Sequence, residues 1–276
     1  MLKRLFAVAI FLWLAACGWL YGWQENVLFH FLPVDESHAF AFDMPTREVW
    51  LDRPDGARLN GVVFLADEPR RGAIVYYKGN AGNVGHSESM ARIFTPLGFD
   101  VVSMDYRGFG KSRGEMSEDA LIDDAVAWYD WTKARYAEED VRIVGYSLGT
   151  SLSAQVAERR LVGDVILFAP MKSVLDVGQR RYPFVPSFLA RYPLRSDLAL
   201  ADAGASRIVI YHGTEDEVIP LASGIELKPL LGPDDAFEVI EGADHVDLPW
   251  RPEVTADIRR RWGRGFQSAN SAEAAS

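Results

Sequence analysis

The chain has 276 residues, of which 49% are hydrophobic, enough for the core of a large domain and too many for a globally disordered chain. Its 39 acidic and 29 basic side chains give a formal net charge of −10, which argues against a nucleic-acid partner because phosphates repel an acidic surface. The one cysteine, Cys17, lies in the N-terminal apolar run, so the rest of the chain can form no disulfide, thiolate nucleophile or sulfur metal site.

The first segment has the features of a membrane anchor. Lys3 and Arg4 precede 19 residues without a charge, 5–23, and a helix of that length would span roughly 28 Å, close to a bilayer core. By the positive-inside rule, we expect residues 1–25 to be a transmembrane helix with the main domain on the extracytoplasmic side. A lipoprotein signal is the alternative, because Leu-Ala-Ala-Cys-Gly at 14–18 is similar to a lipobox in which Cys17 would be lipidated. A cleaved signal peptide is a third alternative.

The rest of the chain divides into an apolar connector at 26–45, a main domain at 46–264 and a Ser- and Ala-rich tail at 265–276 that we expect to be disordered. Short apolar runs predict strands at 61–65, 73–77, 100–104, 141–144, 165–168, 208–211 and 237–240. Helical patterns lie between them, at 117–136, 147–159 and 252–262. This alternation predicts an α/β fold with a mostly parallel, doubly wound sheet and helices on both faces.

Residues 171–206 interrupt that alternation with many aromatic residues and prolines. The composition favours a small cap-like insertion over a regular crossover. It could be a surface loop with its own cluster, or a wall of a substrate pocket, since loops of this kind often shape binding sites.

Gly-Tyr-Ser-Leu-Gly at 145–149 is a G-x-S-x-G motif that follows a predicted strand and opens a predicted helix. Glycines on both sides of the serine let the backbone of this sharp turn pass close to its neighbours. The turn displays the hydroxyl at the carboxyl edge of the sheet. We therefore expect Ser147 to be a nucleophile.

A nucleophilic serine needs a base and an acid that orients the base. The motif resembles the nucleophile turn of the α/β-hydrolases, and that resemblance implies that the acid and the histidine follow the serine along the chain. Of the five histidines, His245 alone follows both Ser147 and a loop with acidic residues after a late strand. We expect His245 to be the general base and Asp216 to be the acid, with Glu215 as the second choice.

Two backbone amides should stabilise the oxyanion. We expect one to be the amide of Leu148, next to the nucleophile, and the other to be the amide of Asn80, in the glycine-rich loop at 78–83. The glycines at 105–112 fit neither common nucleotide-binding pattern, and we expect a structural turn there.

Together these blocks resemble the α/β-hydrolase superfamily, and within it the membrane-anchored protein depalmitoylases and their bacterial relatives. The matching blocks, in the family's order, are residues 78–83, 105–112, 145–149, 212–220 and 242–245. The resemblance implies the α/β-hydrolase fold and hydrolysis of esters, thioesters or sometimes amides without a cofactor or metal. One departure is Lys78, where the family usually has histidine; the lysine could change loop anchoring or attract anionic substrate groups.

We therefore expect a serine hydrolase that acts on a small-molecule or lipid-like acyl substrate through an acyl-enzyme intermediate. A serine peptidase of the same fold, similar to an aminopeptidase, is the main alternative because it would share the triad and differ in its pocket. A non-catalytic binding protein of this fold is a weaker alternative, since the chain keeps Ser147, Asp216 and His245 in order.

Overall fold

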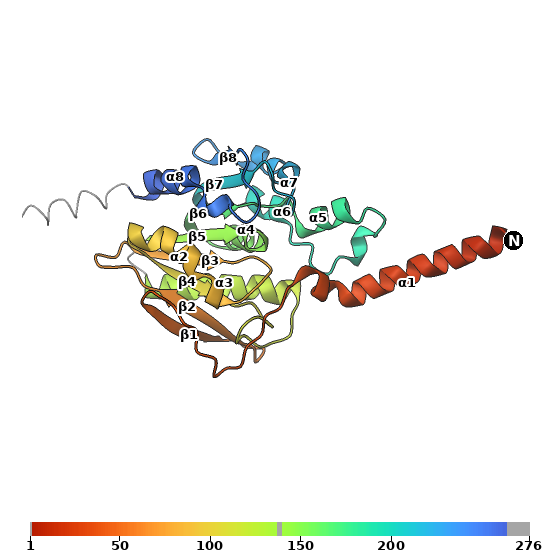
Figure 1. The fold of residues 1–276 in the computed structure, drawn as a ribbon, viewed down its shortest axis with the longest axis horizontal. Coiled ribbons are helices and arrows are strands. Elements are labelled where there is room, and N and C mark those ends of the chain that lie inside the picture. Colours follow the sequence, from red (N-terminus) through yellow and green to blue (C-terminus); the bar gives the residue numbers. More distant parts are fainter. Residues whose placement is uncertain (1, 137–139, 264–276) are drawn as a thin grey trace, which may run out of the picture.

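The computed structural model describes residues 2–136 and 140–263, whose strands form an eight-stranded sheet with helices on both faces (Figure 1). The strand order across the sheet is β1-β2-β4-β3-β5-β6-β7-β8. β2 runs antiparallel to both β1 and β4, and every other neighbouring pair is parallel. The strands are β1 Thr46–Asp52, β2 Arg58–Phe64, β3 Gly72–Tyr77, β4 Phe99–Met104, β5 Asp140–Tyr146, β6 Val162–Phe168, β7 Ala205–Gly213 and β8 Ala236–Ile240.

The seven strands expected from apolar runs are present as β2 to β8, and the prediction of a mostly parallel sheet is confirmed. β1 was not predicted, because this edge strand is half exposed and its charged residues break the apolar pattern. The interior strands β3 and β4 are buried along their whole length. Continuous burial is the reason that these strands could be recognised from composition.

Helices cover the two faces of the sheet and form two cores. On one face, α3 (Glu118–Arg135) and α4 (Leu148–Arg159) pack over the sheet, with Trp128 and Leu152 fully buried. On the other face lie α2 (Glu88–Phe94) and α8 (Pro252–Trp262). Their residues Phe94 and Trp262 are buried in the second core, where the two rings contact each other. Coverage of both faces makes the sheet doubly wound, as expected.

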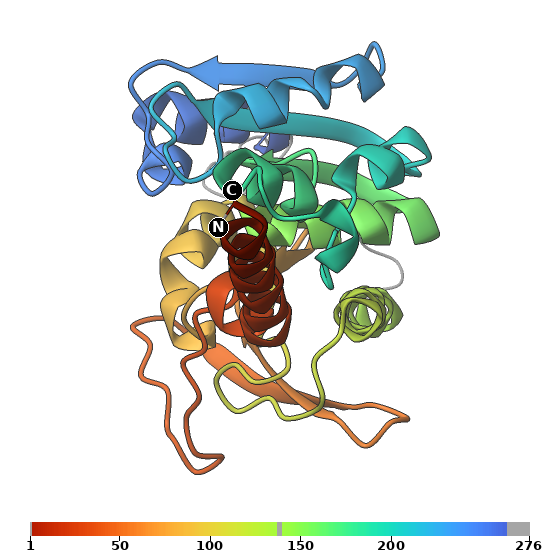
Figure 2. The same cartoon turned by 90° about the vertical axis from the view of Figure 1, so that its right-hand side faces the viewer.

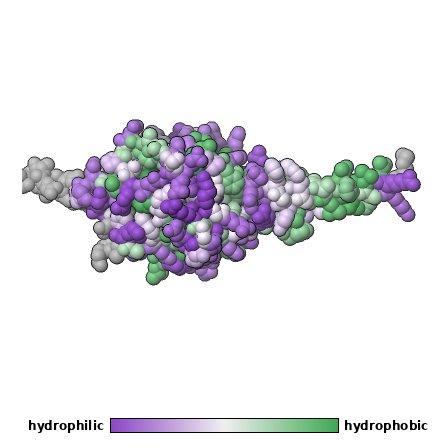
Figure 3. Space-filling model, turned by 90° about the horizontal axis from the view of Figure 1, so that it is seen from below, coloured by the Kyte–Doolittle hydropathy of each residue, from purple (hydrophilic) through white to green (hydrophobic). Residues whose placement is uncertain are grey.

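The N-terminal helix α1 (Leu2–Leu28) projects from the body, and its apolar surface is visible in Figure 3. The helix continues past the predicted end of the anchor at residue 25, so residues 26–28, which we had placed in the connector, are helical. Directly after the helix, Phe29 is buried against Phe109 and Tyr192, with ring centroids 6.2 and 5.1 Å away. The predicted disordered tail at 265–276 lies outside the described residues.

The insertion between β6 and β7 lies beside α1, as Figures 1 and 2 show from two directions. It contains α5 (Val174–Arg181), a short 3₁₀ turn (Ser187–Leu189) and α6 (Ser196–Ala201), and it is followed after β7 by α7 (Leu221–Ile225). The side chain of Gln24 bonds the backbone of residues 189 and 191, and Tyr192 donates to Glu25 Oε1 at 2.7 Å. These bonds dock the second half of α1 onto the insertion.

Candidate active site

Ser147 occupies the turn between β5 and α4, with φ of 53° and ψ of −120°. A non-glycine residue with positive φ is strained, and such strain persists only where the surrounding packing enforces it. Both glycines of the motif are needed for that packing. A Cβ on Gly149 would lie 1.9 Å from the Tyr77 carbonyl oxygen, and one on Gly145 would lie 2.5 Å from Ser153 Oγ. The two glycines therefore let the turn form so that the serine hydroxyl reaches the site.

The structure brings together the three side chains predicted to act in catalysis. The Ser147 hydroxyl donates to His245 Nε2 across 3.0 Å, and His245 Nδ1–H donates to Asp216 Oδ2 across 2.7 Å. All three side chains are largely buried. The carboxylate accepts from Nδ1, which leaves Nε2 free to accept a proton from the serine. This arrangement can therefore move a proton from an attacking hydroxyl to an imidazole.

Asp216 is the acidic residue of its loop that reaches His245, whereas Glu215, the second choice, is exposed. Its other oxygen, Oδ1, accepts the backbone N–H groups of Val218 and Ile219 at 2.9 and 2.7 Å. Such donors stabilise a buried carboxylate in its charged form. The carboxylate is consequently fixed in position and orients the imidazole.

Two residues near this centre were not predicted. The Tyr146 hydroxyl donates to the backbone carbonyl of His245 at 2.9 Å, and the two rings lie 5.2 Å apart. His212 is fully buried 3.7 Å from Asp216, and its burial lowers its pKa. Tyr146 adjoins the nucleophile in sequence. No sequence pattern, however, places Tyr146 beside His245 or His212 beside Asp216.

Asn80 and Leu148 line the same cavity as Ser147. Leu148 is the first residue of α4, where a backbone N–H has no partner within the helix. The Asn80 side chain donates to the Leu28 carbonyl at 2.7 Å, and the Asn80 carbonyl accepts the His30 N–H at 2.9 Å. The end of α1 thus holds the loop that carries one expected oxyanion donor.

Lys78 anchors this loop from inside the protein. Its ammonium group donates to the Gly82 carbonyl at 3.1 Å and lies 3.6 Å from the carboxylate of Asp105. Both side chains are buried. Desolvation lowers the pKa of Lys78 to about 8 and raises the pKa of Asp105 to about 6. Of the two roles considered for Lys78, its burial supports loop anchoring and places the ammonium out of reach of a substrate.

The turn at 105–112 packs beneath the loop as a structural element. Tyr106 donates to the Lys78 carbonyl at 2.6 Å, and Ser112 Oγ donates to the Asp105 carbonyl at 2.8 Å. Gly110 has φ of 48°, and a Cβ there would overlap Asp105 Oδ2. Glycine is therefore required at this position, and the expected structural role agrees with these contacts.

A cavity of about 390 Å³ opens over Ser147. The insertion supplies much of its wall, which is the second of the two roles considered for that segment. The end of α1 supplies another part, which the sequence analysis did not foresee. The lining residues are Val27, Leu28, Phe29, His30, Asn80, Ser147, Leu148, Met171, Val174, Val177, Gly178, Arg181, Tyr182, Tyr192, Leu194, Val218 and Ile219.

Comparison with known proteins gives matches in both sequence and structure. Residues 68–192 match a family model described as serine aminopeptidase, S33. The chain is 31% identical over 224 residues to the lysophosphatidylserine lipase ABHD12 of Macaca fascicularis, a match that covers 69% of this chain and 56% of that lipase. It is 29% identical over 207 residues to an uncharacterized protein of Mycobacterium tuberculosis, covering 73% of each chain.

Two solved esterases share the architecture. An esterase of Pyrococcus furiosus matches with a TM-score of 0.68 at 16% identity, over 84% of this chain and 97% of the esterase. Acetyl xylan esterase 1 of Thermoanaerobacterium matches with a TM-score of 0.62 at 17% identity, over 83% of this chain and 86% of that enzyme. At these identities the likeness shows a common fold.

Proposed function

This chain belongs to the α/β-hydrolase superfamily, and from that premise we propose that it is a serine hydrolase that cleaves carboxylic esters or thioesters. The observation that carries the proposal is the hydrogen-bonded series Ser147–His245–Asp216 at the base of a mainly apolar cavity. A series of this kind makes a serine hydroxyl nucleophilic at neutral pH.

The reaction proceeds in two steps. Ser147 Oγ attacks the acyl carbonyl as His245 Nε2 takes its proton, and the imidazolium then returns that proton to the departing alkoxide or thiolate. A water molecule next gives a proton to Nε2 and attacks the acyl-enzyme, which releases the carboxylic acid and regenerates the hydroxyl. Asp216 holds the imidazole in the tautomer that both steps require.

The developing oxyanion is stabilised by the backbone N–H groups of Leu148 and Asn80. Leu148 offers its N–H at the beginning of α4, where the helix dipole also favours negative charge. Asn80 offers its N–H from a loop held by Leu28, His30 and Lys78. Loss of one donor of this type typically costs about 100-fold or more in kcat.

The composition of the cavity favours an acyl substrate over a peptide. An aminopeptidase must hold the ammonium group at the end of its substrate, and a carboxylate is the usual partner for such a group. Among the described residues that line the cavity, none is Asp or Glu, and the one Lys or Arg is Arg181. A cavity with this charge repels an ammonium group and accepts hydrocarbon.

The protein is held at a membrane by α1, with the catalytic domain on the extracytoplasmic side. α1 is long and apolar enough to cross a bilayer, and Cys17 is its only buried residue among Leu2–Leu28. Lys3 and Arg4 at its start favour a cytoplasmic N-terminus. The intact masses of wild type and Cys17→Ser test the lipoprotein alternative: they should differ only by the substitution if α1 is retained, whereas wild type should lack residues 1–16 and carry lipid at Cys17 if the cysteine is acylated.

Hydrolysis is tested by reacting the full chain in detergent with p-nitrophenyl butyrate, a matching butyryl thioester, aminoacyl p-nitroanilides and a fluorophosphonate probe. We expect wild type to hydrolyse both esters and to be labelled at Ser147. Ser147→Ala should lose about 10⁶-fold in kcat, and the exposed Ser89→Ala variant should match wild type. Equal rates for wild type and Ser147→Ala, or an unlabelled Ser147, contradict the proposal, whereas anilide hydrolysis without ester hydrolysis favours the peptidase.

A further inference from the structure

A second, narrower cavity lies between α1 and the insertion and adjoins the cavity over Ser147. Its volume is about 120 Å³, and its lining is almost entirely apolar on both sides. Six residues belong to the walls of both cavities: Val27, Leu28, Val174, Gly178, Tyr182 and Tyr192. The two spaces therefore share a wall, and one lies beside α1 while the other lies over the candidate nucleophile.

One face of α1 forms a wall of this groove. Leu20, Tyr21, Gln24, Val27 and Leu28 line it, which is the spacing of a single helix face. The stretch from Leu20 to Leu28 is about 12 Å long at 1.5 Å per residue. The polar atoms of Gln24 already bond the Leu189 carbonyl at 3.0 Å and the Arg191 N–H at 2.7 Å. A ligand in the groove would consequently meet apolar surface.

The groove ends at Leu20, inside the charge-free run at 5–23, and the insertion continues beside α1 beyond that end. Trp13 Nε1 donates to the Phe184 carbonyl at 3.2 Å, so the insertion follows α1 as far as Trp13. Trp13 lies near the middle of the charge-free run at 5–23, about 15 Å from Trp23 along the helix axis, which is about half of a hydrocarbon core. The loop at 182–190 also has no charged residue.

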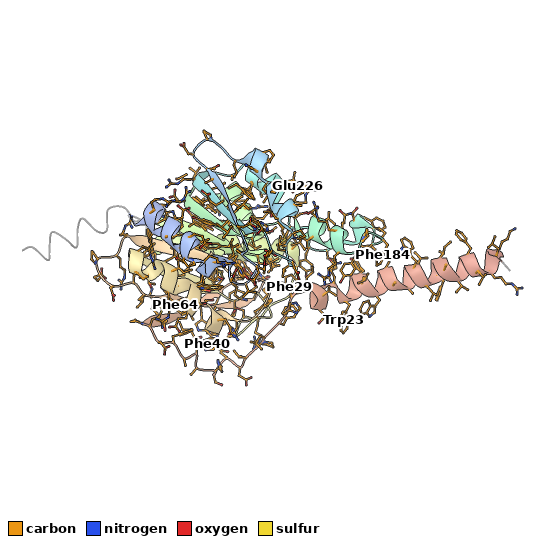
Figure 4. All side chains as sticks on the ribbon, turned by 45° about the horizontal axis from the view of Figure 1, so that its top comes forward. Trp23, Phe29, Phe40, Phe64, Phe184 and Glu226 are labelled. Carbon is orange, nitrogen blue, oxygen red and sulfur yellow. The ribbon has the colours of Figure 1, made fainter. Side chains whose placement is uncertain are left out.

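The insertion presents large apolar side chains on this side of the molecule. Phe184 is 62% exposed and Phe188 is 82% exposed. Figure 4 shows Phe184 over α1, with Trp23 pointing away on the opposite side of the helix. Large apolar side chains of this kind beside a membrane helix favour contact with lipid over contact with water.

We propose that the groove between α1 and the insertion is an acyl-chain channel, through which a long hydrocarbon chain enters sideways from the bilayer and brings its carbonyl to Ser147. The membrane helix is then part of the substrate site as well as an anchor. The substrate class is an ester or thioester of a long unbranched acyl chain that resides in the membrane. This inference rests on the proposed hydrolase function.

Gly178 provides the means to test the channel. It lies on α5 in the wall of both cavities, and a Cβ built there would have no heavy atom within 4 Å. Phenylalanine at this position would fill the junction of the cavities without displacing the backbone. Leu198→Phe places the same ring at an exposed position of the insertion that lines neither cavity, so it is the matched control.

The assay compares kcat/KM for p-nitrophenyl butyrate and p-nitrophenyl palmitate with the full chain in phospholipid nanodiscs. For Gly178→Phe we expect the ratio of kcat/KM for palmitate to kcat/KM for butyrate to fall about 50-fold, as when about three buried methylenes lose their contacts. Leu198→Phe should keep both activities. Equal loss on both esters, or no loss on palmitate, overturns the channel. If the proposed hydrolase function itself is wrong, Ser147→Ala will still hydrolyse butyrate at the wild-type rate.

A second measurement needs no variant. A long-chain alkyl fluorophosphonate that carries a terminal diazirine is attached to Ser147. The labelled protein is then irradiated, and the crosslinks that the diazirine forms are mapped by mass spectrometry. Crosslinks to the α1 segment from Leu20 to Leu28, or to residues 174–190 of the insertion, support the channel. Crosslinks confined to other parts of the chain overturn it even where the probe labels Ser147.

Discussion

Replacement of Lys78 with methionine should destabilise the protein, because it leaves the Asp105 carboxylate buried without a positive partner. Methionine keeps most of the apolar length of the lysine chain, which packs with its ammonium 4.2 Å from the ring centroid of Phe109. The change therefore removes the charge and the bond to Gly82 with little loss of volume. The loop that carries Asn80 loses its internal anchor at the same time.

The size of the effect follows from the burial of the pair. Removal of one partner of a buried ion pair typically costs about 3–5 kcal/mol. We expect the lower end, about 3 kcal/mol, since Asp105 can take up a proton when its partner is lost. In a domain of this size each kcal/mol lowers Tm by about 2–4 °C, so thermal unfolding of Lys78→Met in detergent should occur about 6–12 °C below wild type.

Dependence on pH separates this explanation from a general packing defect. Burial raises the pKa of Asp105 from its ordinary value of 3.8 to about 6, so its ionisation costs stability as the pH rises from about 4 through 6. Below pH 6 the wild-type carboxyl is also neutral, and Lys78 has no charged partner. The difference in unfolding free energy between wild type and Lys78→Met should accordingly narrow between pH 7 and pH 5.

The double variant Lys78→Met with Asp105→Asn is the control, because it removes both charges. It should recover most of the lost stability relative to Lys78→Met alone. A Tm of Lys78→Met within 2 °C of wild type, a difference that does not vary with pH, or a double variant no more stable than the single one would refute the reasoning.

Three further changes test the site. Asp216→Asn should lower kcat for butyrate esters about 10⁴-fold, since the amide no longer selects the required tautomer of His245; a loss below tenfold would argue against its role. Asn80→Ala keeps its backbone N–H but loses the 2.7 Å bond to Leu28, so kcat should fall about tenfold with Tm nearly unchanged, and unchanged kcat would show that the bond does not position the loop. Gly149→Ala places a Cβ 1.9 Å from the Tyr77 oxygen and should lower stability by at least about 1–3 kcal/mol in urea unfolding, whereas Gly178→Ala should not.

Local patterns carried much of the information about the fold. The parallel strands were recognisable because burial on both faces requires continuous apolar runs. The edge strand β1 was missed because it is half exposed and needs no continuous apolar run. The motif around Ser147 was recognisable because its turn demands glycine at fixed spacing. Chain order then singled out His245 and the acidic loop of Asp216 and Glu215, and the structure places Asp216 within hydrogen-bonding distance of His245.

Other features of the site depend on contacts between residues far apart in the chain. The bond from Asn80 to Leu28 joins residues 52 positions apart, and the bond from Trp13 to Phe184 joins residues 171 apart. No periodicity or spacing encodes such pairs, because they form only when separate elements pack together. The sequence by itself determined the sheet, the nucleophile turn and the apolar character of α1. Only the tertiary structure decided that Lys78 points inward to Asp105 and that the membrane helix forms a wall beside the candidate nucleophile.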